Sequence, residues 1–293
     1  MLLTWPAPAK INLFLYINNR RHDGYHNIQT VFKFLNYGDE IKIQRRNDNK
    51  IQLFTLMSHT TNIKQNIILR AANILKLYCK NRKKYRSNFG ANIFLKKKLP
   101  IGSGLGGGSS NAATTLIALN VIWKTNINDK ILCKLASILG ADVPIFIKGY
   151  SCYAEGIGNK FTSIKLPDKW YLVLYPNLII STKKIFNDPA LKQYTKKKNI
   201  STLLNIPYKN DCAPIVLKRF PIVKKMFTWL SKYNTAYLTG TGSSIFAEFE
   251  TKIDAHNVLN KIPKWMNGFV ARSTHISPLH KYRNIIFNIL NNK

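Results

Sequence analysis

Acidic side chains are scarce in this sequence. Its 293 residues include 13 Asp and Glu against 45 Lys and Arg, which gives a formal net charge of +32. Such a charge is typical of nucleic-acid binding, of attraction for an anionic substrate, or of the Lys, Asn and Ile bias of AT-rich coding. The basic residues are spread along the chain, and the densest stretches (82–84, 96–98 and 196–198) are short. We therefore favour compositional bias and expect no nucleic-acid partner.

Closely spaced cysteines and long apolar runs are also missing. The four cysteines are far apart and form no Cys-x-x-Cys pair, which argues against a zinc site and a disulfide framework. No apolar run approaches the ~20 residues of a membrane span. Residues 1–6 contain no basic segment followed by an apolar one, so a signal peptide is not expected. These features predict reduced thiols in a cytoplasmic protein without a membrane segment.

The length and the 45% hydrophobic content predict two folded domains of mixed α+β structure, at residues 1–155 and 156–293. Hydrophobic periodicity predicts the elements within them. The expected strands are 11–17, 30–36 and 40–45 (separated by a turn at 37–39), 91–95, 145–147, 151–154, 171–175, 236–239 and 245–249. The expected helices are 66–78, 109–123, 128–139, 211–219 and 221–232.

A glycine-rich loop is the clearest chemical signal. Five glycines lie within 102–108, and an Ala- and Leu-rich helix is expected directly after them. Glycines let backbone amides approach phosphates, and a helix N-terminus adds unpaired N–H groups and a favourable dipole. The hydroxyls of Ser109 and Ser110 can reach phosphate oxygens or Mg²⁺. No Lys follows the last Gly, so this is not a Walker A loop, and it is not a dinucleotide fingerprint. An ordinary Gly-rich turn would not need five glycines. The loop therefore predicts a kinase that uses ATP to phosphorylate a hydroxyl group.

A kinase acting on a neutral hydroxyl often uses a carboxylate as general base. Asp142 is flanked by Ala141 and by Val143-Pro144, which is unusual for a surface acid, although a helix cap or turn aspartate is an equal alternative. Lys10 lies directly before the buried strand expected at 11–17 and projects to the same face as Asn12. A lysine there can pair with a carboxylate and stabilise developing negative charge. The alternative for Lys10 is a strand-edge residue that prevents aggregation.

Tyr25 and His26 occupy a polar loop after the first expected strand. An aromatic ring followed by an imidazole can stack on a nucleobase and hydrogen-bond to its edge. Phe32 and Phe186 can add further aromatic faces. Each of these residues alone is more often part of a core than of a ligand site.

Together these segments resemble the kinase superfamily of galactokinase, homoserine kinase, mevalonate kinase and phosphomevalonate kinase. Its signature is Pro-x-Gly-x-Gly-Leu-Gly-Ser-Ser. The resemblance covers nearly the whole chain and is carried by residues 6–13, 23–26, 99–113, 140–144, 170–173, 210–212, 238–242 and 277–280. Residues 23–26 are similar to a subfamily that phosphorylates the 2-hydroxyl of a methylerythritol unit in a cytidine diphosphate substrate, within isoprenoid precursor biosynthesis.

The resemblance implies the two-domain α+β small-molecule kinase fold, with the active site in the cleft between the domains and ATP with Mg²⁺ as cofactor. It implies that Lys10 and Asp142 are the catalytic pair and that Asn12 lies beside the reacting hydroxyl. Around the cytidine it places Tyr25, His26, Phe32, Thr182 and Phe186. It places Asn66 and Lys97 near the adenine and, along the phosphates, Pro100, Ile101, Gly102, Ser103, Gly104, Leu105, Gly106, Gly107, Gly108, Ser109 and Ser110.

The chain departs from the superfamily pattern at three places. Ser103 and Gly107-Gly108 differ from the superfamily consensus, Ser181 stands where the subfamily has proline, and residues 282–293 extend beyond the expected end as a basic tail. Another kinase of the superfamily, such as homoserine kinase, remains the alternative. Tyr25 and His26 discriminate between the two, because homoserine offers no base to stack on. The sequence leaves the metal ligands unknown and the oligomeric state open between monomer and homodimer.

Overall fold

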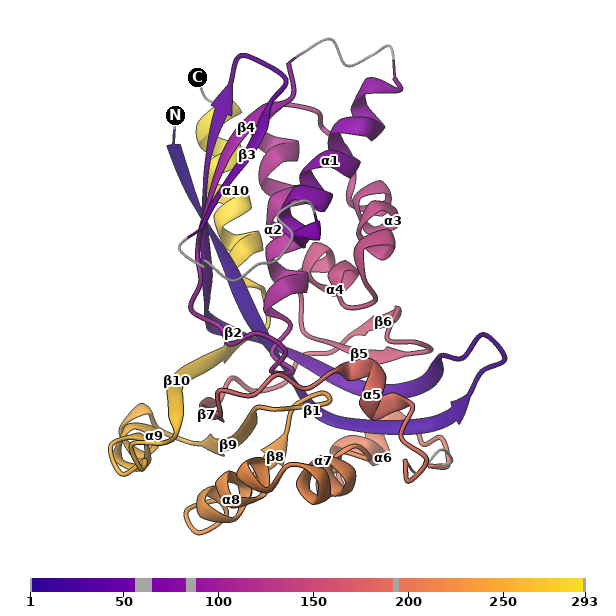
Figure 1. The fold of residues 1–293 in the computed structure, drawn as a ribbon, viewed down its shortest axis with the longest axis vertical. Coiled ribbons are helices and arrows are strands. Elements are labelled where there is room, and N and C mark those ends of the chain that lie inside the picture. The colour runs from indigo at the N-terminus through magenta and orange to yellow at the C-terminus, as the bar shows by residue number, and fades with distance from the viewer. Residues whose placement is uncertain (1, 56–64, 83–87, 192–194, 292–293) are drawn as a thin grey trace.

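The computed structural model describes residues 2–55, 65–82, 88–191 and 195–291, and within them ten strands form one connected sheet (Figure 1). The main path through the sheet is β3-β4-β2-β10-β7-β9-β8, while β1 pairs with β2 and β5 pairs with both β2 and β6. In the same ranges, none of the helices is both long enough and apolar enough to span a membrane.

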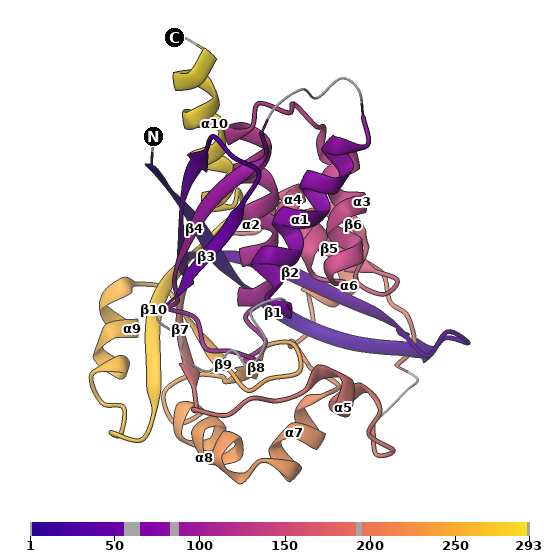
Figure 2. The same ribbon diagram turned by 45° about the horizontal axis from the view of Figure 1, so that its top comes forward.

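The N-terminal half is built on two long antiparallel strands, β1 (Leu2–Arg20) and β2 (His26–Arg46). β1 is buried almost continuously from Ala7 to Ile17, as the apolar sequence predicts. The register shifts between Pro8 and Lys10 and again between Asn12 and Leu15. Such bulges redirect side chains locally, and here they flank Lys10 and Asn12. The hairpin end of the two strands projects beyond the N-terminal helices (Figure 2).

One hydrophobic core joins these strands to five helices. The remaining elements of this half are β3 (Ile51–Thr55), α1 (Ile67–Lys80), β4 (Gly90–Lys96), α2 (Gly107–Ile122), α3 (Asp129–Leu139), α4 (Val143–Lys148), β5 (Cys152–Glu155) and β6 (Lys160–Ser163). The fifth helix of the core is α10 (Pro278–Asn291). It follows the C-terminal half in the sequence but packs in the N-terminal half, beside β1.

The C-terminal half has its own core under a smaller part of the sheet. Its elements are β7 (Trp170–Tyr175), α5 (Thr182–Phe186), α6 (Ile200–Leu204), α7 (Ala213–Arg219), α8 (Pro221–Leu230), β8 (Tyr237–Leu238), β9 (Ile245–Phe249), α9 (Lys252–Leu259) and β10 (Asn267–Thr274). β10 connects the halves, since it pairs with β7 along its length and with β2 through Ser273 and Thr274. A third core fills the space between β1 and β7.

The turn predicted at 37–39 is wrong, because β2 runs through these residues as one strand. Gly38 is used for close approach rather than for turning: a Cβ atom there would lie 2.1 Å from the Ala7 carbonyl oxygen. Tyr37 stacks on Phe269 at 3.9 Å between ring centroids, and the buried Asp39 pairs with Lys97 at 2.7 Å. Turn-forming residue types therefore serve strand packing here.

The strand predicted at 145–147 is also wrong, because these residues belong to the helix α4. Pro144 lies in its first turn and Gly149 ends it with φ +72°, which are the usual positions of proline and glycine around a helix. A short buried apolar run is compatible with either element, so periodicity could not decide.

The predicted basic tail at 282–293 is instead largely the packed helix α10. Tyr282 meets Trp5 edge to face at 5.1 Å between centroids, Ile286 is buried, and Arg283 pairs with Asp129 at 2.8 Å. The domain boundary near residue 155 stays a prediction.

Candidate active site

A cleft of about 1070 Å³ is lined by residues from both halves of the molecule. Pockets for small ligands are typically about 300–1,000 Å³, so the cleft has room for a nucleotide and a second small molecule. The predicted site residues that line it are Lys10, Asn12, Tyr25, His26, Phe32, Asn66, Lys97, Pro100, Ile101, Gly102, Ser103, Gly104, Gly106, Gly107, Gly108, Ser109, Asp142, Thr182 and Phe186. The other two, Leu105 and Ser110, lie buried behind the glycine-rich loop.

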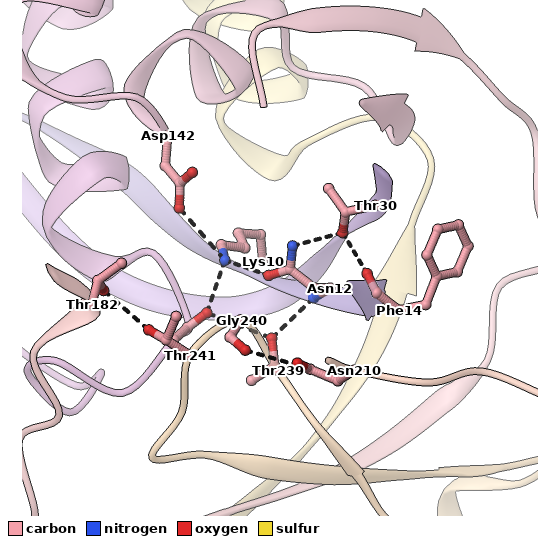
Figure 3. A network of polar contacts seen from close by, with 11 residues as sticks. Lys10, Asn12, Phe14, Thr30, Asp142, Thr182, Asn210, Thr239, Gly240 and Thr241 are labelled. Atoms are coloured by element: carbon pink, nitrogen blue, oxygen red, sulfur yellow. Dashed lines mark hydrogen bonds and ion pairs between the residues drawn. The ribbon is translucent and has the colours of Figure 1, made fainter. Parts of the chain in front are cut away.

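Lys10 is at the centre of the cleft's polar network (Figure 3). Its side chain is buried, and its ammonium donates to Asn12 Oδ1 at 2.6 Å and to the Gly104 carbonyl at 2.9 Å. The ammonium also lies 3.6 Å from Asp142 Oδ2 and 5.4 Å from the ring centroid of Phe32. The contact with Asn12 agrees with the expectation that both side chains project to one face of β1.

Burial lowers the pKa of Lys10, and the nearby carboxylate of Asp142 counteracts this effect. The ammonium is thus positioned by two fixed acceptors and faces one carboxylate across a short gap. A cation held in this way can stabilise negative charge that develops beside it without having to reorganise.

Asp142 differs from every other acid in the chain. Ten of the 13 acidic residues form ion pairs, and the other three accept hydrogen bonds. Every carboxylate except Asp142 has a described donor within 3.3 Å. Asp142 occupies the N-cap position of α4, yet its side chain makes no capping hydrogen bond among the described residues. The Asp142 carboxylate therefore keeps oxygen lone pairs that no close donor occupies.

The glycine-rich loop leads directly into α2. Gly102, Gly104 and Gly106 all have positive φ, and Gly106 is the left-handed N-cap of the helix. At Gly104 a Cβ atom would lie 2.3 Å from the Thr239 carbonyl oxygen, so only glycine fits. At Gly108 the corresponding position is open space. The loop therefore presents an uncovered helix N-terminus to the cleft, which is the geometry that binds phosphate.

Two predicted adenine contacts, Asn66 and Lys97, also lie on the cleft wall. Asn66 caps α1, where its Oδ1 accepts from Ile68 N at 2.9 Å. The Lys97 ammonium, paired with Asp39, lies 3.1 Å from the Cβ position at Gly107 and so beside the first turn of α2. Their contact with adenine stays a prediction.

The hairpin end and α5 together form an aromatic pocket. The His26 ring stacks on Phe186 at 5.3 Å between centroids with 27° between the planes. The imidazole is buried, and its Nε2 has no hydrogen-bond partner among the described residues. Burial, assisted by the charge of Arg20, lowers the pKa of His26 and so favours the neutral ring. Tyr25 is 58% exposed at the rim of the pocket.

The second glycine turn, residues 239–244, supplies cleft residues that sequence reasoning did not assign. Gly240 and Thr241 line the cleft, and Thr241 shares a hydroxyl hydrogen bond of 3.0 Å with Thr182. Ser181, in place of the expected proline, caps α5 through its hydroxyl and the Lys184 N–H. The run of Gly, Thr and Ser at 239–244 was the signal that could have identified this wall of the cleft.

Comparison with known proteins agrees with this geometry. The sequence model for the GHMP kinases N terminal domain matches residues 66–150, and the model for GHMP kinases C terminal matches residues 191–268. A crystal structure of 4-(cytidine 5'-diphospho)-2C-methyl-D-erythritol kinase is similar with a TM-score of 0.78 and 27% identity. That likeness covers 92% of this chain and 99% of the other.

Two further structures are similar at lower identity. Mevalonate kinase from Methanococcus jannaschii has a TM-score of 0.62 and 18% identity, covering 94% of this chain and 98% of that one. Homoserine kinase from Cytophaga hutchinsonii has a TM-score of 0.58 and 17% identity, covering 94% and 95%. These two show a shared fold.

Proposed function

Because the chain belongs to the GHMP kinases and is therefore an ATP-dependent kinase of small molecules, we propose that it phosphorylates the 2-hydroxyl of 4-diphosphocytidyl-2-C-methyl-D-erythritol. This reaction would serve isoprenoid precursor biosynthesis that does not pass through mevalonate. The proposal goes beyond the family in one respect, the identity of the phosphate acceptor.

The aromatic pocket of His26 and Phe186 carries this proposal. A buried, neutral imidazole with an unpartnered Nε2 can exchange a hydrogen bond with the edge of a flat polar base. Phe186 lies against one face of the imidazole, and Tyr25 at the rim has room to stack on a bound ring. Lys10 and Asp142 line the same cleft. The arrangement therefore suits a substrate with a nucleobase at one end and a reacting hydroxyl at the other.

The proposed mechanism assigns a task to each residue. Asp142 accepts the proton of the attacking hydroxyl, Asn12 lies beside that hydroxyl, and Lys10 stabilises the developing charge. The glycine-rich loop holds the ATP phosphates, so that catalysis rests mainly on positioning and electrostatics. When bound, ATP with Mg²⁺ supplies the transferable phosphoryl group and neutralises phosphate charge.

The described residues fit a magnesium ion that arrives with ATP. They contain no group of three or more His, Cys, Asp or Glu side chains that could hold a metal on its own. Mg²⁺ typically needs few protein ligands, since phosphates and water fill most of its coordination shell. The Ser109 hydroxyl, which lines the cleft in the first turn of α2, is the group that would hold it.

The decisive experiment measures ADP release with the cytidine substrate, with homoserine and with mevalonate. We expect turnover only with the first. His26→Ala should raise KM for the cytidine substrate and leave KM for ATP nearly unchanged. A stacked aromatic ring is worth ~1–3 kcal/mol, so Tyr25→Ala should lower kcat/KM by ~5–150-fold.

The control is His22→Ala, which removes an exposed imidazole from the same hairpin end but not from the cleft lining. It should leave both KM values unchanged. If homoserine were the better acceptor, the assignment of the substrate would be wrong. If His26→Ala lowered the melting temperature and weakened both substrates together, the imidazole would only pack the hairpin onto α5.

A further inference from the structure

Thr239 connects three parts of the active site that are far apart in the sequence. Its side chain is fully buried, and its Oγ1 accepts a hydrogen bond of 2.9 Å from the Asn12 backbone N–H. The same hydroxyl donates to the Gly104 carbonyl, at 3.5 Å. That carbonyl is one of the two acceptors of the Lys10 ammonium. Thr239 therefore contacts both β1 and the glycine-rich loop at the points where each holds Lys10.

Asn210 fixes the position of Thr239 (Figure 3). The Asn210 side-chain amide donates to the carbonyls of Leu238 and Gly240, each at 2.8 Å, and so clamps the backbone on both sides of Thr239. Its Oδ1 accepts from Cys212 N at 2.9 Å, so every hydrogen atom of the amide and its oxygen are used. The next residue, Asp211, bonds to β1 through Leu15 O at 2.8 Å.

The glycine-rich loop rests on the C-terminal half along its backbone. The Gly102 carbonyl accepts from Ile180 N at 3.2 Å, and the Ser103 carbonyl accepts from Ser244 N at 2.9 Å. The Thr239 hydroxyl extends this series to Gly104. Three consecutive loop carbonyls are thus held by residues more than 70 positions away in the sequence.

We propose that Thr239, clamped by Asn210, is a positioning residue that sets the Lys10 ammonium relative to Asp142 and to the phosphates bound by the loop. The placement of the phosphates rests on the function proposed above. Thr239 does not touch the reacting atoms. It acts by two routes. It holds the backbone of Asn12, and the side chain of Asn12 accepts a hydrogen bond from Lys10; it also holds the Gly104 carbonyl, which accepts a second hydrogen bond from Lys10.

Thr239→Val keeps the shape of the side chain but removes the acceptor of a buried N–H group. An unpaired buried donor is destabilising, and the strand can relieve this cost by shifting at Asn12. Such a shift displaces Lys10, which is proposed to act in the transition state, so it should lower kcat more than it weakens substrate binding. We expect kcat to fall about 10- to 100-fold, with KM for either substrate changed less than about threefold. Thr239→Ser retains the hydroxyl and should restore kcat to within about threefold of the wild-type value.

The control is Thr125→Val. Thr125 is also buried, and its hydroxyl donates to Asn120 Oδ1 at 2.6 Å, outside the cleft lining. This variant should lose some thermal stability and keep its kcat. If Thr239 had only a structural role, Thr239→Val would likewise lose stability and keep its kcat. Equal kcat values for Thr239→Val and Thr125→Val would therefore overturn the proposal.

Amide hydrogen exchange tests the positioning role without any assumption about the substrate. In Thr239→Val, exchange should rise in peptides covering 9–14 and 102–106 relative to Thr239→Ser and Thr125→Val. Unchanged exchange in both peptides overturns the proposal. A wild-type protein that fails to phosphorylate the cytidine substrate overturns the proposed function instead, and the exchange data still decide the role of Thr239.

If Thr239→Val does not fold, Asn210→Asp provides the second test. A carboxylate cannot donate to the Leu238 and Gly240 carbonyls, so Thr239 loses its clamp while its hydroxyl remains. The same two peptides should exchange faster, and kcat should fall with little change in KM. Normal kcat with normal exchange in this variant counts against the proposal.

Discussion

Replacing Asp142 with asparagine tests the chemistry of the cleft most directly. Asn has nearly the same shape and removes only the charge and the ability to take up a proton. The Asp142 carboxylate lies 3.6 Å from the Lys10 ammonium and has no closer described donor. The substitution therefore breaks one ion pair and leaves the two hydrogen bonds of Lys10 to Asn12 and Gly104 in place.

The expected losses of activity and stability differ in size. Loss of a general base lowers kcat by ~10²–10⁴-fold, which corresponds to ~3–5 kcal/mol in the activation barrier. The Asp142 side chain is 40% exposed, so solvent screens its attraction to Lys10. Pairs of this kind contribute about 0–1 kcal/mol to folding. We therefore expect Asp142→Asn to be nearly inactive, nearly as stable as the wild type, and still able to bind ATP.

The assay combines single-turnover phosphoryl transfer, titration of a fluorescent ATP analogue and thermal unfolding. Asp129→Asn is the matched control, because the Asp129 side chain is 42% exposed and pairs with Arg283 outside the cleft lining. Asp129→Asn should be about as stable as Asp142→Asn but should keep full activity. The assignment of Asp142 as the general base is refuted if Asp142→Asn retains more than about a tenth of the wild-type kcat while folded.

Gly106→Val should weaken the ATP analogue about tenfold or more, because Gly106 has φ +72° and a Cβ atom there would lie 2.9 Å from Phe146 Cζ. Unchanged affinity in a folded Gly106→Val variant would mean that the loop does not hold phosphate. His280→Gln tests a pH effect: burial lowers the pKa of His280 to about 4, so the unfolded chain binds a proton below pH 6.5 that the folded protein refuses. Between pH 7 and pH 5 the free energy of unfolding should therefore fall by about 2 kcal/mol more in the wild type than in His280→Gln. Urea unfolding at the two pH values measures this difference, and identical pH dependence of the two proteins would contradict it.

Features that depend on neighbouring residues were predictable from the sequence. The glycine-rich loop followed by a helix is a local pattern, and α2 begins at Gly107 within that pattern. The alternation of side chains along a strand placed Lys10 and Asn12 on one face, and their hydrogen bond of 2.6 Å agrees. Asn128, the first residue of the helix predicted at 128–139, caps that helix by accepting from Ile131 N. In each case the residues concerned are close together in the sequence.

Features that depend on contacts between distant segments were not predictable in this way. The sequence of residues 37–39 contains turn formers, and only the proximity of Ala7 shows why a glycine is needed inside β2. The contact of His26 with Phe186 joins residues 160 positions apart. The hydrogen bond between Asn12 and Thr239 joins residues 227 apart. Resemblance to known kinases could supply some of these residues, whereas periodicity and spacing could not.

The scarcity of acids makes the position of Asp142 informative in a way that a balanced composition would not. With 45 basic residues available, nearly every carboxylate in the chain has acquired a close donor, and a carboxylate whose nearest donor is 3.6 Å away requires something that prevents closer pairing. Here the competing donor is itself restrained, because the Lys10 ammonium is held by Asn12 Oδ1 and the Gly104 carbonyl. The gap of 3.6 Å to Asp142 is thus a consequence of how β1 and the loop fix Lys10. A hydroxyl group placed beside this pair would meet a proton acceptor and a cation together, and both can assist phosphoryl transfer to an alcohol.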